Sequence, residues 1–143
     1  MMRVALHKAS SGSMSTRERL IRDRLRAAPL RHLFPEIEQL RIELIFNESD
    51  ARSTTPSPQL HTLFAAAAAF FRFPCPCADC DGDFDLTEAV SRLMSNTATR
   101  GRATSLSGHS SCQGVRFRAH ADHQSSCPMQ LRFELSAESQ RTA

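Results

Sequence analysis

The chain has 143 residues, a formal net charge of +3, 41% hydrophobic and 23% charged residues, and neither tryptophan nor tyrosine. This length and composition are typical of one soluble globular domain, and a charge so close to neutral does not by itself indicate a nucleic-acid partner. No secretory signal is visible, and the longest apolar run, residues 63–71, is about half of the roughly 20 residues that a membrane-spanning helix needs. We therefore expect a cytoplasmic protein of bacterial type with no membrane partner.

The N-terminal part is expected to contain a disordered tail followed by a helical segment. Residues 1–14 are polar and rich in serine, which predicts disorder. Ser15 and Glu18 form the S-x-x-E pattern of a capping box and open a helical segment over residues 15–33, which Pro29 ends or kinks. The apolar residues of the first helix form a narrow stripe: Leu20, Ile21 and Leu25.

Period-two alternation predicts strands in four segments: residues 38–48, the end of the alanine run near residues 71–75, residues 113–119 and residues 128–135. The residues expected to face the core are Leu40, Ile42, Leu44 and Phe46, then Phe71, Phe73 and Cys75, then Val115, Phe117 and Ala119, and finally Met129, Leu131, Phe133 and Leu135. Residues 49–58 are predicted to be an exposed loop, and the alanines themselves are compatible with helix or strand.

Residues 85–94 have the clearest helical pattern. Asp85 and Glu88 form a D-x-x-E cap. The apolar residues then recur at intervals of three and four: Leu86, Ala89, Val90, Leu93 and Met94. The polar residues 95–105 that follow are predicted to be a loop.

The predicted order of elements is helix, strand, strand, helix, strand, strand, which indicates an α+β fold. We expect a small antiparallel β-sheet with one packed helix, plus the N-terminal helix. These elements would form a single domain over residues 15–136. Residues 137–143 are predicted to be a disordered C-terminal tail.

Cysteines carry the most specific chemical signal in the sequence, and there are five of them: Cys75, Cys77, Cys80, Cys112 and Cys127. An odd number in a chain without an export signal argues against a disulfide framework and favours metal binding or redox chemistry. Cys77 and Cys80 have the C-x-x-C spacing with which two thiolates bind one metal ion from a tight turn, and Gly82 would ease a backbone with positive φ. Cys112 begins a second Cys-x-Gly element, and Cys127 precedes the last predicted strand.

Zinc prefers four soft or borderline ligands, so one of the five cysteines is in excess of a Cys₄ site. Cys80, Cys112 and Cys127 are the first three candidates, and the fourth is Cys77 with C-x-x-C spacing or Cys75 with C-x₄-C spacing. A competing set consists of Cys77, Cys80, His109 and Cys112, because the sequence HSSCQG repeats the ligand spacing of CADCDG. That set would leave Cys127 free.

Two ligand-bearing turns held by a small sheet resemble the zinc-ribbon proteins. The resemblance covers residues 73–135 and depends on the ligand spacing and the two Cys-x-Gly elements, whereas a second C-x-x-C is missing and a helix separates the two halves. It implies a zinc-ribbon-like site with Zn²⁺ as a structural ion. Many zinc ribbons bind nucleic acids or other proteins.

The function expected from these patterns is that of a small non-catalytic zinc-binding protein, a binding or adaptor domain for an unknown protein partner. A nucleic-acid-binding zinc ribbon is the first alternative, because five arginines alternate with apolar residues on predicted strands and can share an exposed face: Arg41, Arg72, Arg116, Arg118 and Arg132. A thiol redox protein is the second alternative, disfavoured because the aspartates around the C-x-x-C turn would raise thiol pKa values. No nucleophile or nucleotide-binding motif indicates an enzyme.

Two further acidic or histidine-containing patterns are less specific. The alternating aspartates do not place Gly and Glu where an EF-hand loop needs them. Asp85 is therefore expected to cap the following helix, whereas Asp79, Asp81 and Asp83 favour the positive end of that helix and solvate the turn. His120, Asp122 and His123 can form a second metal site or a solvated surface.

Overall fold

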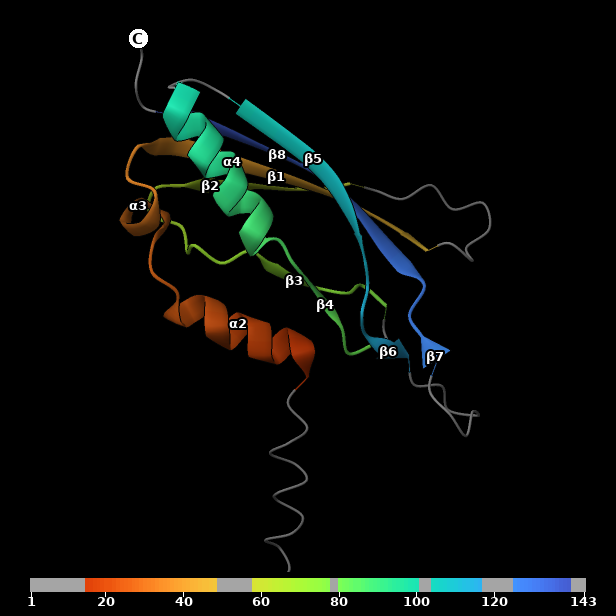
Figure 1. The fold of residues 1–143 in the computed structure, drawn as a ribbon. Coiled ribbons are helices and arrows are strands. Elements are labelled where there is room, and N and C mark those ends of the chain that lie inside the picture. Colours follow the sequence, from red (N-terminus) through yellow and green to blue (C-terminus); the bar gives the residue numbers. More distant parts are fainter. Residues whose placement is uncertain (1–14, 49–57, 78–79, 101–103, 117–124, 140–143) are drawn as a thin grey trace, which may run out of the picture.

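A four-stranded antiparallel sheet lies at the centre of the computed structural model, which describes residues 15–48, 58–77, 80–100, 104–116 and 125–139. The spatial order of its strands is β2-β1-β8-β5 (Figure 1). The bounds are Gln59–Phe64 for β2, Ile37–Glu48 for β1, Met129–Ser139 for β8 and Thr104–Ser111 for β5. The two longest strands, β1 and β8, pair in the middle, from Ile37 opposite Ser139 to Glu48 opposite Met129.

The inner face of this sheet carries the alternating apolar residues of β1 and β8. Leu40, Ile42 and Leu44 are fully buried, and in the register they lie opposite Ala137, Leu135 and Phe133. The period-two predictions for residues 38–48 and 128–135 are therefore confirmed for these residues. The outer face consists mainly of the polar residues that alternate with them.

Helix α4, Thr87–Arg100, covers the inner face (Figure 1). Its buried residues are Val90, Leu93, Met94 and Thr97, and Leu86 just before the helix is also buried. The helix is longer than predicted, since residues 95–100 are helical and not a loop. Thr97 continues the buried face at helical spacing, and its hydroxyl is satisfied by donating to the Leu93 carbonyl at 2.9 Å and by bonding to Thr104. Polar composition at residues 95–100 thus does not interrupt the helix.

Helix α2, Thr16–Arg26, has the predicted capping box. The Glu18 amide donates to the Ser15 hydroxyl at 3.1 Å, and the Ser15 amide donates to the Glu18 carboxylate at 3.0 Å. Leu20 is buried, whereas Ile21 and Leu25 are 57% and 81% exposed, so the predicted three-residue stripe is wrong. Of the three residues, only Leu20 is buried against the rest of the chain.

The short helix α3, Leu30–Leu33, and the chain before it are joined to the alanine run by backbone hydrogen bonds. The Leu30 amide donates to the Ala67 carbonyl at 2.7 Å, and the Ala69 amide donates to the Ala28 carbonyl at 2.8 Å. The alanine run therefore forms neither a helix nor a strand of the sheet. A small hairpin follows them, with β3, Arg72–Pro74, antiparallel to β4, Asp83–Asp85.

The C-terminal half departs from prediction at two boundaries. Strand β8 continues to Ser139, so residues 137–139 belong to the sheet and not to the predicted tail, and Ala137 is fully buried. The strand predicted over residues 113–119 is described only as β6, Val115–Arg116, which pairs with β7, Ser125–Ser126. Phe117 and Ala119, like the predicted tail at residues 1–14, lie outside the described residues.

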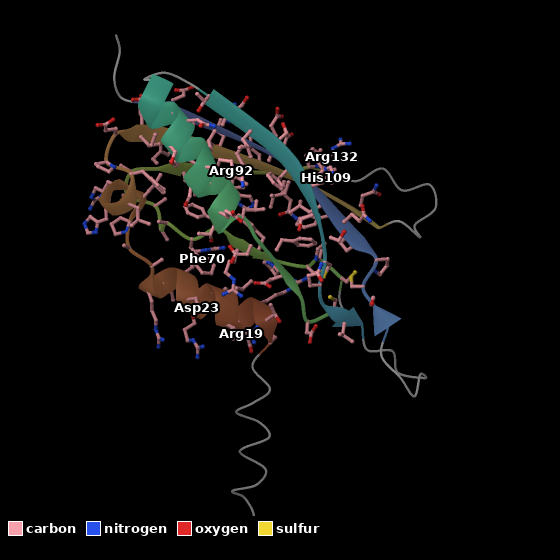
Figure 2. The ribbon with its side chains drawn as sticks, in the orientation of Figure 1. Arg19, Asp23, Phe70, Arg92, His109 and Arg132 are labelled. Atoms are coloured by element: carbon pink, nitrogen blue, oxygen red, sulfur yellow. The ribbon has the colours of Figure 1, made fainter. Side chains whose placement is uncertain are left out.

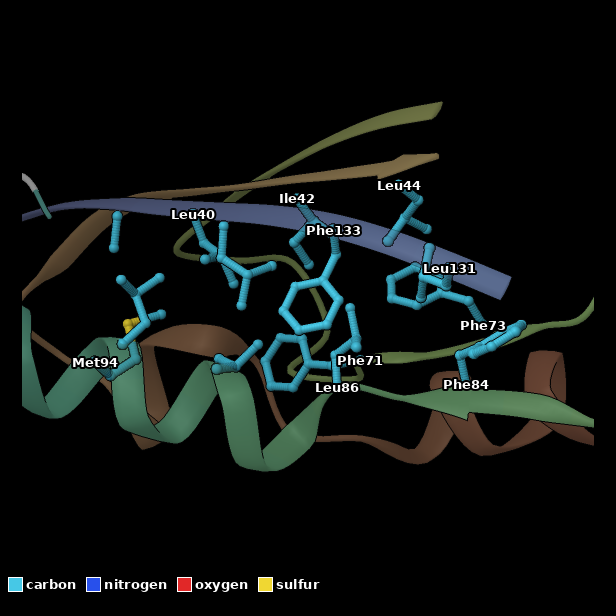
Figure 3. Close-up of a cluster of buried hydrophobic side chains, with 14 of the residues drawn as sticks. Leu40, Ile42, Leu44, Phe71, Phe73, Phe84, Leu86, Met94, Leu131 and Phe133 are labelled. Atoms are coloured by element: carbon cyan, nitrogen blue, oxygen red, sulfur yellow. The ribbon is translucent and has the colours of Figure 1, made fainter. Parts of the chain in front are cut away.

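The hydrophobic core fills the space between the sheet, α4 and the β3–β4 hairpin (Figure 3). Phe71, Phe73 and Phe84 enter it from the hairpin side, and the Phe84 ring centroid lies 5.5 Å from that of Phe46. The same buried cluster includes Cys75, Cys112 and Cys127. The core therefore extends directly to the cysteines. None of the helices in the described ranges combines the length and apolar character needed to cross a bilayer.

Candidate metal centre

Four cysteine sulfur atoms converge in the folded chain. The Sγ atoms of Cys75, Cys80, Cys112 and Cys127 all lie within 4.8 Å of one another. The Cys75–Cys127 distance is 3.8 Å, and the Cys80–Cys112 distance is 3.6 Å. A tetrahedral ion with metal–sulfur bonds of 2.3 Å requires sulfur–sulfur edges of about 3.8 Å. This arrangement can hold a metal ion.

The four cysteines lie just outside the ends of strands, which is why residues far apart in the sequence meet. Cys75 follows β3 and Cys80 precedes β4, while Cys112 follows β5 and Cys127 stands between β7 and β8. Backbone hydrogen bonds fix these positions. The Cys75 amide donates to the Gly82 carbonyl at 3.0 Å, the Cys112 amide to the Met129 carbonyl at 3.0 Å, and the Cys127 amide to the Gly114 carbonyl at 3.2 Å.

The two Cys-x-Gly elements form equivalent turns. The Gly82 amide donates to Cys80 Sγ at 3.3 Å, and the Gly114 amide donates to Cys112 Sγ at 3.3 Å. Hydrogen bonds of this kind favour the thiolate form that a metal ion binds. The two turns therefore each present one sulfur atom in the same way.

The reason for glycine in these turns differs from the expected one, because neither Gly82 nor Gly114 has a positive φ. A Cβ atom on Gly82 would lie 2.7 Å from Cys112 Sγ, and a Cβ atom on Gly114 would lie 2.8 Å from Cys80 Sγ. Each glycine thus makes room for the sulfur atom of the opposite turn. Close approach, and not backbone conformation, explains the residue type.

Asp81 connects the two turns to each other and to α2. Its Oδ1 atom accepts a hydrogen bond from the Val115 amide at 3.0 Å, and its carbonyl accepts one from the Thr16 hydroxyl at 2.8 Å. The sequence predicted only that this aspartate favours the positive end of the following helix and solvates the turn. The sequence feature that could have indicated this bridging role is the position of Asp81 directly before the glycine of a Cys-x-Gly turn.

Burial is the main influence on the thiols themselves. It raises the pKa of Cys75 above the ordinary value, and neighbouring cysteines add to the shift. Burial also raises the pKa of Cys80, against the opposing effect of the hydrogen bond from the Gly82 amide. A raised pKa keeps the thiol protonated without a cation, which is the opposite of what a redox-active nucleophile needs.

Cys77 and His109 occupy different positions from the four convergent sulfur atoms. Cys77 Sγ lies 3.7 Å from Cys127 Sγ, so the fifth thiol is adjacent to the cluster, and it is partly exposed. His109 is exposed on β5, in register with Arg132 on the outer face of the sheet (Figure 2). The group of convergent ligand atoms does not include His109, which removes the geometric basis of the competing Cys77, Cys80, His109 and Cys112 set.

The outward arginines do not form a purely basic surface where the structure describes them. Arg72 is bound to Asp83, with distances of 2.7 Å from Nη2 and 2.9 Å from Nε to the same carboxylate oxygen. Arg41 and Arg132 share the outer face of the sheet with acidic residues, since Glu43 and Glu134 lie opposite each other in the register. The side chains of Arg116 and Arg118 lie outside the described part of the chain.

The remaining sequence predictions concern the aspartates and histidines. Asp85 belongs to β4, and its carboxylate accepts hydrogen bonds from the amide and hydroxyl of Thr87, so it binds the first residue of α4 and not Glu88. Glu88 instead pairs with Arg92 at 3.6 Å. Asp79 and the predicted second site at His120, Asp122 and His123 lie outside the described residues.

Comparisons with models of protein families, with curated proteins and with solved structures found no match to this chain. The four convergent sulfur atoms, the two glycine turns and the bridging Asp81 are therefore the observations from which a function can be argued. They support a metal-binding centre at one end of an α+β domain.

Proposed function

We propose that this protein is a non-catalytic binding or adaptor domain, stabilised by one structural zinc ion that is held by Cys75, Cys80, Cys112 and Cys127. The observation that carries the proposal is the mutual approach of the four sulfur atoms within 4.8 Å. Four thiolates complete a tetrahedral shell, so no open position remains for water or a substrate. A closed site of this kind has a structural role.

The ion would join the β3–β4 hairpin to the ends of the sheet strands, in addition to the hydrophobic core that they share. The β3–β4 hairpin carries two of the ligands, and the ends of β5 and β8 carry the other two. Zinc binding at structural sites contributes on the order of 10 kcal/mol or more to folding. Without it, the four thiols, of which three are buried, would contact one another, the Cys77 thiol and the turn amides, and no cation would balance their thiolate charge.

The outer face of the sheet supports the binding role. Helix α4 covers the inner face, whereas Leu60 and Phe64 on the edge strand β2 are 54% and 56% exposed. Both residues lie in register with outward-facing residues of β1, namely Glu43 and Gln39. An edge strand that carries exposed apolar side chains can pair with or pack against another protein.

Metal analysis of the purified full-length chain tests the zinc proposal. We expect one equivalent of zinc per chain by native mass spectrometry and elemental analysis. Replacement by Co²⁺ should give the intense visible bands and sulfur-to-metal charge transfer of a tetrahedral thiolate site. Because four thiolates also suit iron, a red protein with one equivalent of iron would contradict zinc but not metal binding. A metal-free, fully folded protein would refute the centre.

The two alternatives predict different results for the same preparation. A nucleic-acid-binding protein would be retained on single- or double-stranded DNA or RNA at low salt and released steeply as salt increases. A thiol redox protein would reduce a disulfide substrate catalytically. We expect neither behaviour from the zinc-loaded protein, and a positive result in either assay would replace the adaptor proposal.

A further inference from the structure

A hollow of about 180 Å³ lies between α2, β2 and the alanine run, and no cysteine lines it. Its walls come mainly from Arg24 of α2, His61 and Leu63 of β2, and the loop residues Ala67, Ala68 and Phe70. The Phe73 ring also lines the hollow, and the centroids of His61 and Phe73 are 5.1 Å apart. The hollow is thus separate from the metal centre.

His61 provides the first indication of a ligand. Its Nε2 atom is buried and has no hydrogen-bond partner within the described part of the chain. An unpaired buried polar atom costs about 1–3 kcal/mol, and such atoms are usually satisfied by water or by a bound molecule. A molecule that enters the hollow can supply the partner that the imidazole lacks.

Arg24 makes the hollow electrically positive. Its guanidinium carbon lies 5.8 Å from the centroid of the Phe70 ring, which Figure 2 shows beside α2. Its charge also acts on His61, where it adds to burial in lowering the imidazole pKa. No aspartate or glutamate is among the lining residues. A guanidinium and an imidazole N–H without a neighbouring carboxylate are suited to an anion.

The alanines determine the size of the hollow and the character of its walls. Ala67 and Ala68 project only methyl groups where larger side chains would fill the space. Leu63, Phe70 and Phe73 complete an apolar surface. A cavity of about 150 Å³ accommodates benzene. The space therefore suits a compact apolar group attached to one anionic group.

We infer that this hollow binds a small organic monocarboxylate, no larger than benzoate, whose carboxylate accepts hydrogen bonds from Arg24 and His61 while its apolar part contacts Ala67, Ala68 and Phe70. The inference does not depend on the proposed role of the metal centre. It gives the alanine run a function that neither the core nor the cysteines explain.

Nuclear magnetic resonance with the full-length, ¹⁵N-labelled protein tests this site. Sodium benzoate is titrated while the imidazole nitrogens of His61 and the amides of Leu63 and Phe70 are observed. Benzamide serves as the neutral ligand of equal shape, and sodium chloride as the ionic-strength control. We expect saturable shifts with benzoate and at least tenfold weaker binding of benzamide.

Variants locate the binding. Ala67→Leu fills the hollow while keeping both polar groups, and Arg24→Gln removes the charge from an exposed side chain; each should weaken benzoate binding at least tenfold. Arg22→Gln on the same helix is the matched control and should bind as the unmodified protein does. The inference is overturned if benzoate produces no saturable shift, if benzamide binds equally well, or if Arg24→Gln leaves the affinity unchanged.

Discussion

Gly82 and Gly114 pack backbone against backbone beside the sulfur atoms of Cys80 and Cys112. A Cβ atom built on Gly114 would lie 2.6 Å from both Cα and N of Gly82, and one built on Gly82 would lie 2.9 Å from Cα and N of Gly114. Since real Cβ atoms do not approach backbone atoms so closely, any side chain would push the two turns apart. The sulfur positions therefore depend on two residues that supply no metal ligand themselves.

Gly114→Ala is expected to destabilise the metal-bound protein by about 1–3 kcal/mol, as overpacking of a close contact does. It should also weaken metal affinity, because separating the turns moves Cys80 and Cys112. Urea unfolding and competition with a chelator measure the two effects.

Gly108→Ala is the matched control for this substitution. Its added Cβ would meet the tip of the Phe133 ring at 2.7 Å, within the sheet and not at the metal centre. We expect it to reduce stability while leaving metal affinity unchanged. Equal metal affinities of the Gly114→Ala and unmodified proteins would show that the glycine contact does not position the ligands.

Cys77→Ser is expected to keep one zinc ion per chain with nearly unchanged affinity. Cys75 already supplies a sulfur atom within the group of four, whereas Cys77 lies beside Cys127 at 3.7 Å. Cys75→Ser, Cys80→Ser, Cys112→Ser and Cys127→Ser should each weaken binding by more than the roughly 100-fold that can follow loss of a residue supporting a ligand. Metal content and chelator competition for the five variants provide the measurement. Loss of zinc from Cys77→Ser alone would exchange the roles of Cys75 and Cys77.

Alternation in the sequence contained the information that distinguishes these two cysteines. Phe71, Phe73 and Cys75 were expected to share one face, and all three are buried in the structure. Cys75 continues this alternation of core-facing residues, and its sulfur atom is therefore the one that reaches the buried cluster. C-x-x-C spacing pointed to Cys77 instead, because spacing alone describes the turn and not the direction of the preceding strand.

Strand β5 shows why part of the sheet could not be predicted. Its inward positions include Gly108, which has no side chain, and the Phe133 ring of the neighbouring strand lies over it. The apolar contribution at this position comes from another strand, so no alternation is visible in the sequence TSLSGHSS. Strand β2 was not predicted. It leads directly into the alanine run, whose composition is compatible with helix or strand and does not indicate where a strand ends. In contrast, β1 and β8 were predicted from the apolar alternation within their own sequences, and the start of α2 was predicted from its capping box.

Asp81→Ala is expected to lower the free energy of unfolding by about 1 kcal/mol, because the Val115 amide loses its acceptor. Asp81→Asn removes the same charge but keeps an oxygen that can accept this hydrogen bond. The difference between the two variants, measured by urea unfolding of the metal-loaded proteins, therefore isolates the hydrogen bond from the effect of charge near the thiolates. Identical stabilities of the two variants would mean that the bridge between the turns contributes nothing.

The stability of the protein should decrease as the pH falls through the range in which His61 titrates. Burial, with a smaller contribution from the charge of Arg24, lowers the pKa of folded His61 from the ordinary value of 6.5. Below pH 6.5 the unfolded chain consequently binds a proton that the folded chain resists. The stability that the neutral form of His61 confers on the folded protein is therefore fully present above pH 6.5. It is lost as the pH falls through the folded pKa.

His61→Phe should make this part of the pH profile flatter, because the replacement ring keeps an aromatic contact with Phe73 and cannot be protonated. Urea unfolding of both proteins between about pH 8 and pH 5 provides the comparison, with metal content checked at each pH because protons compete with zinc for thiolates. Above the titration range the variant should be at least as stable as the unmodified protein, since it no longer buries an unpaired nitrogen. Parallel profiles for the two proteins would show that another group causes the loss of stability in acid.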